Sequence, residues 1–304
     1  DVFLQKRKYE TGNFTTLLER KLAPDDYFIV REEHSTVEFE EVIHSGDPAN
    51  NADIAFLAEG YTAGEMDKFI EDIKRVTKYI FEQPPFNQYK DHFNIYAVKS
   101  ISEESGTDVP GEGIYKNTAL NTSYYTFDVP RYLTTYDTRS IRDYASVVPY
   151  DHIFILINTK RYGGGGFYNH YTASTTNHAY SMEVAIHEFG HGFAGLGDEY
   201  YSSGVAYSSF YNTEVEPWEP NLTTMVNFEA KWKDMIDEST PVPTPRESKY
   251  ENTLGVFEGG GYVDEGVYSP FMDCRMKSNS ATGFCPVCRK AIENMILYYL
   301  DKEK

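Results

Sequence analysis

The hydrophobic positions of the chain predict alternating strands and helices beyond residue 50. Three short apolar runs are typical of buried strands: DIAFLA at residues 53–58, FNIYAV at 93–98 and HIFILIN at 152–158. After the first run, apolar residues recur every three or four positions and form one stripe of an amphipathic helix: Met66, Phe69, Ile73, Val76 and Ile80. The order strand, helix, strand favours an α/β layer with a partly parallel sheet.

Polar, glycine and proline residues mark where the predicted helices begin and end. Thr62 followed by Glu65 is a capping box that opens the first helix. The proline pair at residues 84–85 ends it, because proline cannot continue a helix. A second helix is predicted over residues 181–192, and a last amphipathic helix begins near Pro286.

The turn-rich stretch SGDPANNAD at residues 45–53 is the candidate domain boundary. Residues 1–49 are mixed in charge and weakly periodic, so we expect them to form an N-terminal extension or linker. Residues 50–304 are expected to form a single domain of the α/β (α+β) class. Within it, residues 200–262 show little periodicity and are expected to be mostly irregular.

The charge balance limits the classes of partner. The chain has 28 basic and 47 acidic residues, which give a net charge of -19. Such a surface repels phosphate backbones and anionic lipid, so we expect no nucleic-acid partner. No apolar run is long enough to cross a bilayer, and we expect no membrane span. The first residue is not methionine, which suits a processed protein that is secreted or displayed at the cell surface.

The stretch HEFGHGFAGLGDEY at residues 187–200 carries the candidate chemistry. His187 and His191 are four residues apart and project from the same helix face, where they can provide two ligands of a zinc ion. Glu188 lies one step around the helix, so it can serve as the general base without binding the metal. One catalytic Zn²⁺ would activate water for amide hydrolysis. The plainer interpretation is a pair of satisfied core histidines.

A third ligand is expected from the acids that follow the helix. Four glycines within eight residues are costly in a helix, and they are explained if the backbone ends sharply and turns back toward the metal: Gly190, Gly192, Gly195 and Gly197. Asp198 arrives eleven residues after His187 and is the favoured anionic ligand. Glu199 is the rival.

This segment resembles the active-site segment of the IgA-peptidase family of zinc metallopeptidases. Further segments in residues 50 to 300 resemble the family's other recurring segments in the same order: AEGYTAGEMDKF, PFNQYKDHFNIYAV, NTKRYGGGGF, LGVFEGGGY, GVYSP, CRMKS and FCPVC. The resemblance implies a zincin fold, with zinc held by His187, His191 and an acid matched to Asp198, and Glu188 as base. It also implies a metzincin-like methionine turn under the metal, for which Met276 is the candidate; a plain core methionine is the alternative.

The chain departs from the pattern of these families at two positions. Metzincins usually place the third ligand ten residues after the first histidine, where this chain has Gly197. The choice between Asp198 and Glu199 therefore stays open. The family also usually has an aspartate ahead of Gly-Tyr-Thr, where this chain has Glu59, and we expect only a local structural effect.

Lesser candidates for substrate contact lie before and after the motif. Gly163, Gly164 and Gly165 would let a peptide backbone approach and add as a strand, although a flexible loop is equally consistent. Tyr268 could donate a hydrogen bond to an oxyanion, against a purely structural role. His170 and His178 flank the motif and are more simply surface or loop histidines.

The three cysteines lie close together in the sequence near its end. Cys285 and Cys288 form a Cys-x-x-Cys motif with too little chain after it for a redox domain. One such motif with a single further cysteine is short of a four-ligand zinc site. We therefore expect a structural disulfide from Cys274 to one member of the pair.

The sequence thus predicts a zinc-dependent metalloendopeptidase. Its partner would be a protein or peptide substrate, such as immunoglobulin or another host protein. A structural Ca²⁺ is left open. The alternative is a catalytically silent zincin-fold binding or adhesion module, but an intact Glu188 argues against it.

Overall fold

The fold centres on a six-stranded mixed sheet, in a computed structural model that describes residues 2–7, 14–23, 25, 37–201 and 210–300. The strands are, in chain order, β3 (Phe39–Ile43), β4 (Ala52–Glu59), β5 (Phe93–Val98), β6 (His152–Ile157), β7 (Gly164–Phe167) and β8 (Tyr171–Thr175). Their order across the sheet is β3-β5-β4-β6-β8-β7. The four central strands are parallel and both edge strands are antiparallel to their neighbours. The predicted partly parallel sheet is confirmed.

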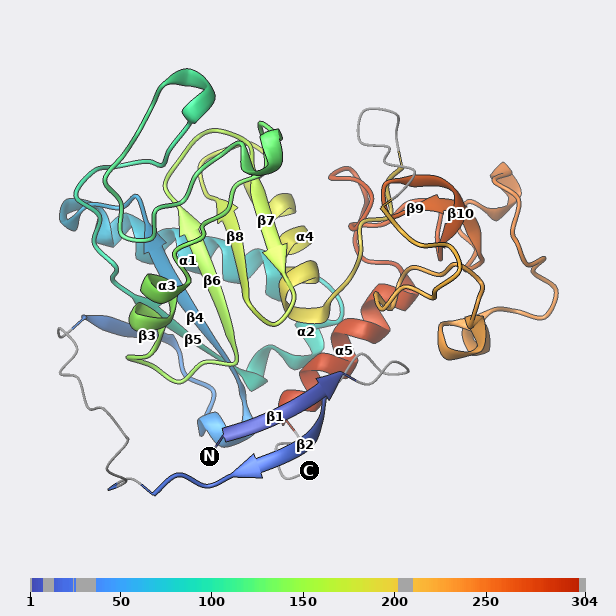
Figure 1. Cartoon of the computed structure of the whole chain (residues 1–304), viewed down its shortest axis with the longest axis horizontal. Helices are drawn as coiled ribbons and strands as arrows, with labels where there is room; N and C mark the ends of the chain where they lie inside the picture. The colour runs from blue at the N-terminus through green and yellow to red at the C-terminus, as the bar shows by residue number, and fades with distance from the viewer. Residues whose placement is uncertain (1, 8–13, 24, 26–36, 202–209, 301–304) are drawn as a thin grey trace.

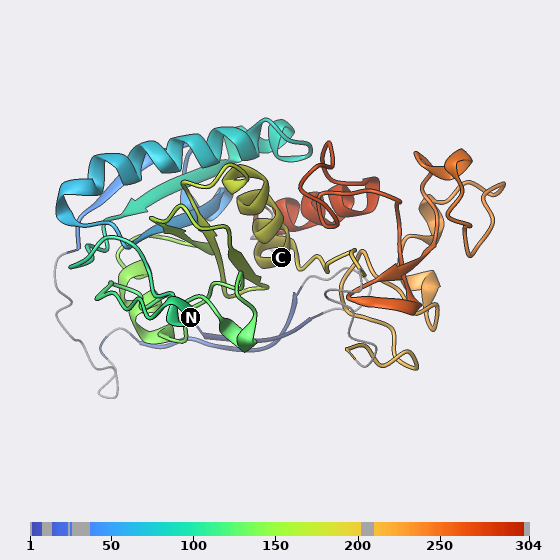
Figure 2. The same cartoon turned by 90° about the horizontal axis from the view of Figure 1, so that it is seen from above.

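The helices of the described residues cover both faces of this sheet. They are α1 (Met66–Phe81), α2 (Phe86–Tyr89), α3 (Thr138–Ala145), α4 (Ser181–Ala194) and α5 (Pro286–Leu300). Helices α1, α4 and α5 share one core with Ile54 and Phe56 of β4, whereas α3 packs on the other face with Ala55 and Leu57. Figure 2 shows α1 and α3 on opposite sides of the sheet. None of the helices in the described ranges is both long and apolar enough to cross a bilayer.

A smaller C-terminal lobe follows α4. It contains the antiparallel strands β9 (Phe257–Gly260) and β10 (Val263–Ser269) among irregular segments and short 3₁₀ turns. Figure 1 shows α4 between the sheet on one side and this lobe on the other, with α5 running beneath both. The face of α4 that turns away from the sheet is therefore available to residues that arrive late in the sequence.

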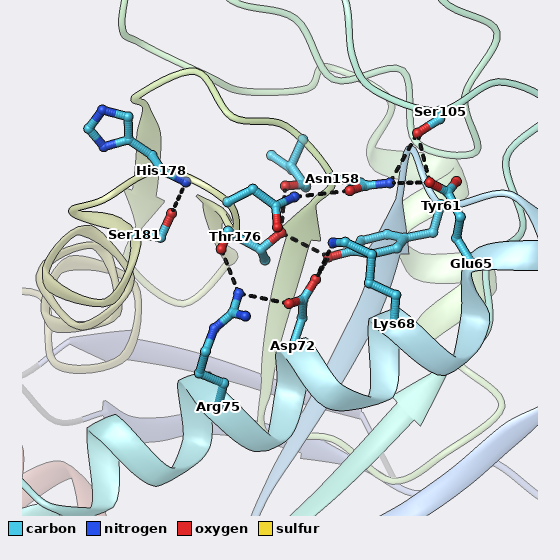
Figure 3. Close-up of polar contacts among 12 residues, drawn as sticks. Tyr61, Glu65, Lys68, Asp72, Arg75, Ser105, Asn158, Thr176, His178 and Ser181 are labelled. Carbon is cyan, nitrogen blue, oxygen red and sulfur yellow. Dashed lines mark hydrogen bonds and ion pairs between the residues drawn. The ribbon is translucent and has the colours of Figure 1, made fainter.

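A buried polar network holds the loop before α4 against α1 (Figure 3). The Tyr61 hydroxyl donates to Asp72 of α1 at 2.7 Å, and Asp72 also pairs with Lys68 at 2.6 Å and with Arg75 at 2.7 Å. Arg75 in turn donates to the carbonyl of Thr176, just after β8, at 2.6 Å. The buried carboxylate is thus fully paired, as a buried charge must be. The network fixes the approach of the chain to α4.

Most of the elements that the apolar patterns predict are confirmed. The three apolar runs form β4, β5 and β6, and the helices predicted over 181–192 and from Pro286 are α4 and α5. The capping box of Thr62 and Glu65 is present, although a 3₁₀ turn precedes α1. Glu59, which stands where the family usually has aspartate, accepts hydrogen bonds on its carboxylate from the loop at residues 118–122. That the departure has only a local effect stays a prediction.

The segment predicted as an extension contributes a strand to the sheet. β3 lies within residues 1–49 and pairs with β5, so the sheet begins before the predicted boundary. Before it, β1 (Val2–Arg7) and β2 (Phe14–Arg20) form an antiparallel hairpin. Residues 8–13, 24 and 26–36 of the predicted extension lie outside the described residues. The division into an extension and a catalytic domain stays a prediction.

A buried histidine beneath α4 couples the stability of this core to pH. His152 of β6 lies edge-on against the rings of Phe189 and Phe193, and its Nε2 is 2.9 Å from the Thr172 hydroxyl. Burial, together with the charges of Arg142 and His170, lowers the pKa of His152 to about 3. Its imidazole is therefore neutral in the folded protein at every pH above that value.

We expect the pH dependence of stability to include a contribution from His152. The unfolded chain takes up a proton near pH 6.5, which the folded chain does not, so stability falls as pH drops from about 6.5 toward 3, by up to about 1.4 kcal/mol per pH unit. His152→Gln should remove this contribution. Urea unfolding between pH 7 and pH 5, with chelator present for both proteins, measures it. Equal slopes for the variant and the native protein would contradict it.

Candidate active site

Helix α4 carries the two histidines of the motif on one face. The Nε2 atoms of His187 and His191 lie 3.0 Å apart. The Nδ1 atom of each ring contacts a backbone carbonyl, that of Arg275 for His187 at 2.9 Å and that of Leu196 for His191 at 2.6 Å. These contacts select the tautomer with hydrogen on Nδ1, so that both Nε2 lone pairs point into the same space. Metal-binding histidines are oriented in this way.

Asp198 completes a triangle with the two imidazoles. Its Oδ1 lies 3.0 Å from Nε2 of His187 and 3.3 Å from Nε2 of His191. Its Oδ2 accepts a hydrogen bond from the Tyr262 hydroxyl, and its carbonyl accepts one from the N–H of Gly261 at 2.7 Å. Burial opposes the charge of Asp198, but the two imidazoles outweigh burial and hold its pKa well below the usual range.

The residues present fit a divalent metal ion. The three atoms are 3.0, 3.0 and 3.3 Å apart. Two ligands at about 2.0 Å from a tetrahedral zinc ion are separated by about 3.3 Å. Oδ1 of Asp198 is buried and has no hydrogen-bond partner among the described residues. When both imidazoles are neutral, their Nε2 lone pairs and the carboxylate oxygen face one another without a hydrogen between them, and a cation at their centre removes the resulting repulsion.

Glu188 lies beside this triangle, close to both imidazoles. Its carboxylate is within 4.8 Å of the ring nitrogens of both histidines. Burial raises its pKa above the usual value, and the charge of Asp198 adds to this, while His187 and His191 act in the opposite direction. A carboxylate with a raised pKa next to a metal site is suited to accept and return a proton near neutral pH.

The sequence as a whole matches one known family. Residues 40–252 and 246–296 match the sequence model described as IgA Peptidase M64. The chain belongs to the IgA peptidase M64 family. It is therefore a peptidase, whose substrate is a polypeptide, and the resemblance seen in the sequence is confirmed. No curated protein matches the chain.

The two rival acids of this M64 peptidase point to different places. Asp198 faces the imidazoles, whereas the side chain of Glu199 is completely buried and faces Cys288 at 3.2 Å and the amide of Asn221 at 2.9 Å. The geometry thus assigns the place near the histidines to Asp198.

The glycines of the M64 motif serve two different purposes. Gly195 ends α4 in the left-handed region at φ 65° and is the only one of the four with a positive φ. Gly190 and Gly192 lie inside the helix, where an added Cβ would be 2.9 Å from the sulfur of Met276 and 2.3 Å from the hydroxyl of Thr172. The expectation that all four serve a sharp helix end is therefore wrong for these two, because they make room for close packing.

The three glycines predicted to bind substrate lie at or just before edge strand β7. The space in front of Gly163 and Gly165 is filled by the chain's own atoms, and the carbonyl of Gly164 accepts from the N–H of Leu133 at 3.2 Å. A substrate strand that adds along β7 would have to replace that contact with the segment around Tyr132. Their role in substrate binding stays a prediction.

Gly164 has a direct connection to the base. A Cβ at this position would lie 2.8 Å from Cγ of Glu188 and 2.9 Å from Val184. We expect Gly164→Ala to displace the Glu188 side chain and to lower kcat by about 10- to 100-fold, since small misplacements of catalytic groups are costly. Metal content should not change. Peptide hydrolysis and metal analysis of the same samples measure both quantities.

Gly64→Ala is the matched control, because nothing lies within 4 Å of a Cβ there. A Gly164→Ala protein with an unchanged thermal midpoint and an unchanged kcat would show that the close approach does not position the base.

The other candidate residues from the sequence differ in their surroundings. Met276 is completely buried against α4 at Gly190, and its role in a methionine turn stays a prediction. Tyr268 pairs with Thr223 through its backbone, and its phenol interacts with Glu258. Its proposed oxyanion role stays a prediction. The two flanking histidines make local contacts: His170 with Arg142, and His178 with Tyr180 and Ser181.

Sequence reasoning missed the residues that orient the ligands. Tyr262 holds Oδ2 of Asp198, and the carbonyls of Arg275 and Leu196 orient the histidines. Tyr132, rather than Tyr268, interacts electrostatically with both Glu188 and Asp198. The sequence drew attention to Tyr262 and Arg275, because both lie in segments that resemble the family's recurring segments: Tyr262 ends LGVFEGGGY and Arg275 lies within CRMKS.

Proposed function

We propose that this M64 peptidase is a zinc-dependent metalloendopeptidase with one catalytic ion held by His187, His191 and Asp198. The observation that carries the proposal is the convergence of two imidazole Nε2 atoms and one unpartnered carboxylate oxygen within 3.3 Å of one another. Nitrogen and oxygen ligands in this number suit zinc in a catalytic site, where three protein ligands leave one position open.

A bound zinc ion supplies a Lewis acid that activates water for attack on a carbonyl at neutral pH. Glu188 is placed to take the proton of the attacking water on its carboxylate and to deliver it to the nitrogen of the departing amine. Its raised pKa lets one group serve in both directions. Peptide hydrolysis needs no covalent intermediate on the protein under this scheme.

The ligand geometry is held from outside the helix. The carbonyl of Arg275 orients His187, and Tyr262 orients Asp198, so two segments that follow α4 in the chain support the centre. Such supporting contacts commonly change metal affinity by about 10- to 100-fold when they are lost. The buried Met276 against α4 supports the assignment to the zincin fold with a methionine turn.

Cleavage of a denatured protein with and without a chelator tests the proposal. Unfolded casein and immunoglobulin A serve as the substrates. We expect internal cleavage of at least one of them, which a chelator stops and added zinc restores. Internal fragments, rather than single released residues, identify an endopeptidase. Absence of cleavage in every condition would favour a silent binding module, and cleavage that persists after complete metal removal would exclude the metal mechanism.

A further inference from the structure

A second group of metal-binding side chains lies behind the first. Glu199, Cys274, Cys285 and Cys288 each offer one ligand atom, and these four atoms all lie within 4.8 Å of one another. The cluster is sealed from solvent, with Cys285 the most exposed member at 4%. All three cysteines are free, so the disulfide expected from Cys274 is wrong for this structure.

The spacing of the sulfur atoms fits metal coordination better than a covalent bond. Sγ of Cys274 lies 3.7 Å from Sγ of Cys288, and the latter lies 3.2 Å from Oε1 of Glu199. Two sulfur ligands at about 2.3 Å from a tetrahedral zinc ion are about 3.8 Å apart. A disulfide requires about 2.05 Å.

The second carboxylate oxygen of Glu199 is an independent sign that a ligand is missing. Oε2 is buried and has no hydrogen-bond partner among the described residues, while Oε1 accepts from Asn221 and Cys288. An unsatisfied carboxylate oxygen in a protein interior is strongly unfavourable. A cation among the three sulfur atoms would satisfy it.

The local backbone suits sulfur ligands in their thiolate form. Cys285 and Cys288 flank the first turn of α5, the Cys-x-x-Cys spacing with which one segment supplies two ligands to a zinc ion. The N–H of Cys285 donates to Sγ of Cys274 at 3.2 Å. A hydrogen-bond donor and a helix N-terminus both favour a thiolate.

Two cationic side chains offset the charge of such a site. Lys277 and Arg246 both interact electrostatically with Glu199. Three thiolates and one carboxylate carry four negative charges, and a divalent ion with these two side chains supplies four positive charges.

We propose that Glu199, Cys274, Cys285 and Cys288 bind a second, structural zinc ion. Four protein ligands fill a tetrahedron and leave no open position, which distinguishes this site from the catalytic one. Soft thiolate ligands favour zinc over magnesium or calcium. The proposal does not depend on the catalytic role of the first site.

The second ion would tie together the segments that build the active site. Glu199 follows Asp198 directly, and its N–H donates to the carbonyl of Met276 at 2.8 Å. Cys274 precedes Arg275, whose carbonyl orients His187. One ion would thus anchor the third catalytic ligand, the carbonyl behind the first ligand and the start of α5.

Metal analysis of the chain purified without chelator tests the proposal. The native protein should contain two zinc ions, and His187→Ala/His191→Ala should retain one. With cobalt bound in place of zinc, the double-histidine variant should show the near-ultraviolet absorption of sulfur-to-cobalt charge transfer. Absence of transition metal from this variant after incubation with zinc or cobalt would overturn the second site without affecting the first.

The state of the thiols provides a test on the unmodified chain, so that a misfolded cysteine variant does not decide the matter. A mercurial reagent should release one zinc ion as three thiols react, and this ion should also be released from the double-histidine variant. Alkylation under denaturing, non-reducing conditions should label all three cysteines. A chain with a Cys274–Cys288 disulfide and one labelled thiol would overturn the proposal.

Discussion

Replacing Glu188 by glutamine is expected to abolish peptide hydrolysis while the catalytic ion stays bound. Glutamine has the same shape as glutamate but cannot accept and return a proton, so we expect kcat to fall by at least about 100-fold, the lower range for loss of a general base. Since His187, His191 and Asp198 already supply three ligands in the proposed site, metal content should remain at the native level. Single-turnover cleavage of casein and metal analysis on one preparation measure both.

Metal content and rate, measured together, distinguish a general base from a metal ligand. Loss of the ion from Glu188→Gln would make Glu188 a ligand and would contradict the assignment of a base. Full activity with the ion bound would place proton transfer on a group other than Glu188.

Asp198→Ala is expected to lose the catalytic ion, with more than about 100-fold weaker zinc binding, because a direct ligand matters more than the groups behind it. Tyr262→Phe removes the hydrogen bond to Oδ2 of Asp198 and keeps all three ligands, so its zinc affinity should fall by about tenfold. Competition with a chromophoric chelator measures both affinities. The order native, Tyr262→Phe, Asp198→Ala is the expected result.

Glu199→Ala separates the two acids. It should leave the ligand triangle intact and lower the metal content at the cysteine cluster, because its carboxylate faces Cys288. A larger loss of the catalytic ion from Glu199→Ala than from Asp198→Ala would reassign the third ligand and contradict the geometry described above.

Long apolar runs and helix signals made much of the fold predictable. β4, β5 and β6 are completely buried, so their sequences are continuously apolar and are easily recognised. β7 and β8 escaped because they read GGGF and YTAST, with small or polar side chains that give little periodicity. β7 needs glycines where the backbone of α4 approaches, since a Cβ on Gly166 would lie 2.3 Å from the carbonyl of Glu188.

The candidate site was predictable only where it depends on local sequence. His187, Glu188 and His191 share one helical turn, so their relative positions follow from helix geometry alone. The choice of Asp198 depends on Tyr262, which is distant in the sequence and approaches through the turn between β9 and β10. The segment LGVFEGGGY draws attention to Tyr262, but its pairing with Asp198 becomes visible only in the fold.

The cysteine cluster illustrates the same limit. The sequence shows one Cys-x-x-Cys motif and one further cysteine, a set that is short of four ligands. The missing member is Glu199, which the motif analysis considered only as a rival ligand of the first site. Only the fold brings residues 199, 274, 285 and 288 into one group.

Anomalous diffraction from crystals at the zinc absorption edge tests the central claim most directly. The account predicts a peak in contact with Nε2 of His187, Nε2 of His191 and Oδ1 of Asp198, at about 2.0 to 2.2 Å from each. A zinc-supplemented crystal with no peak at this position, or with a peak that Asp198 does not contact, would contradict it.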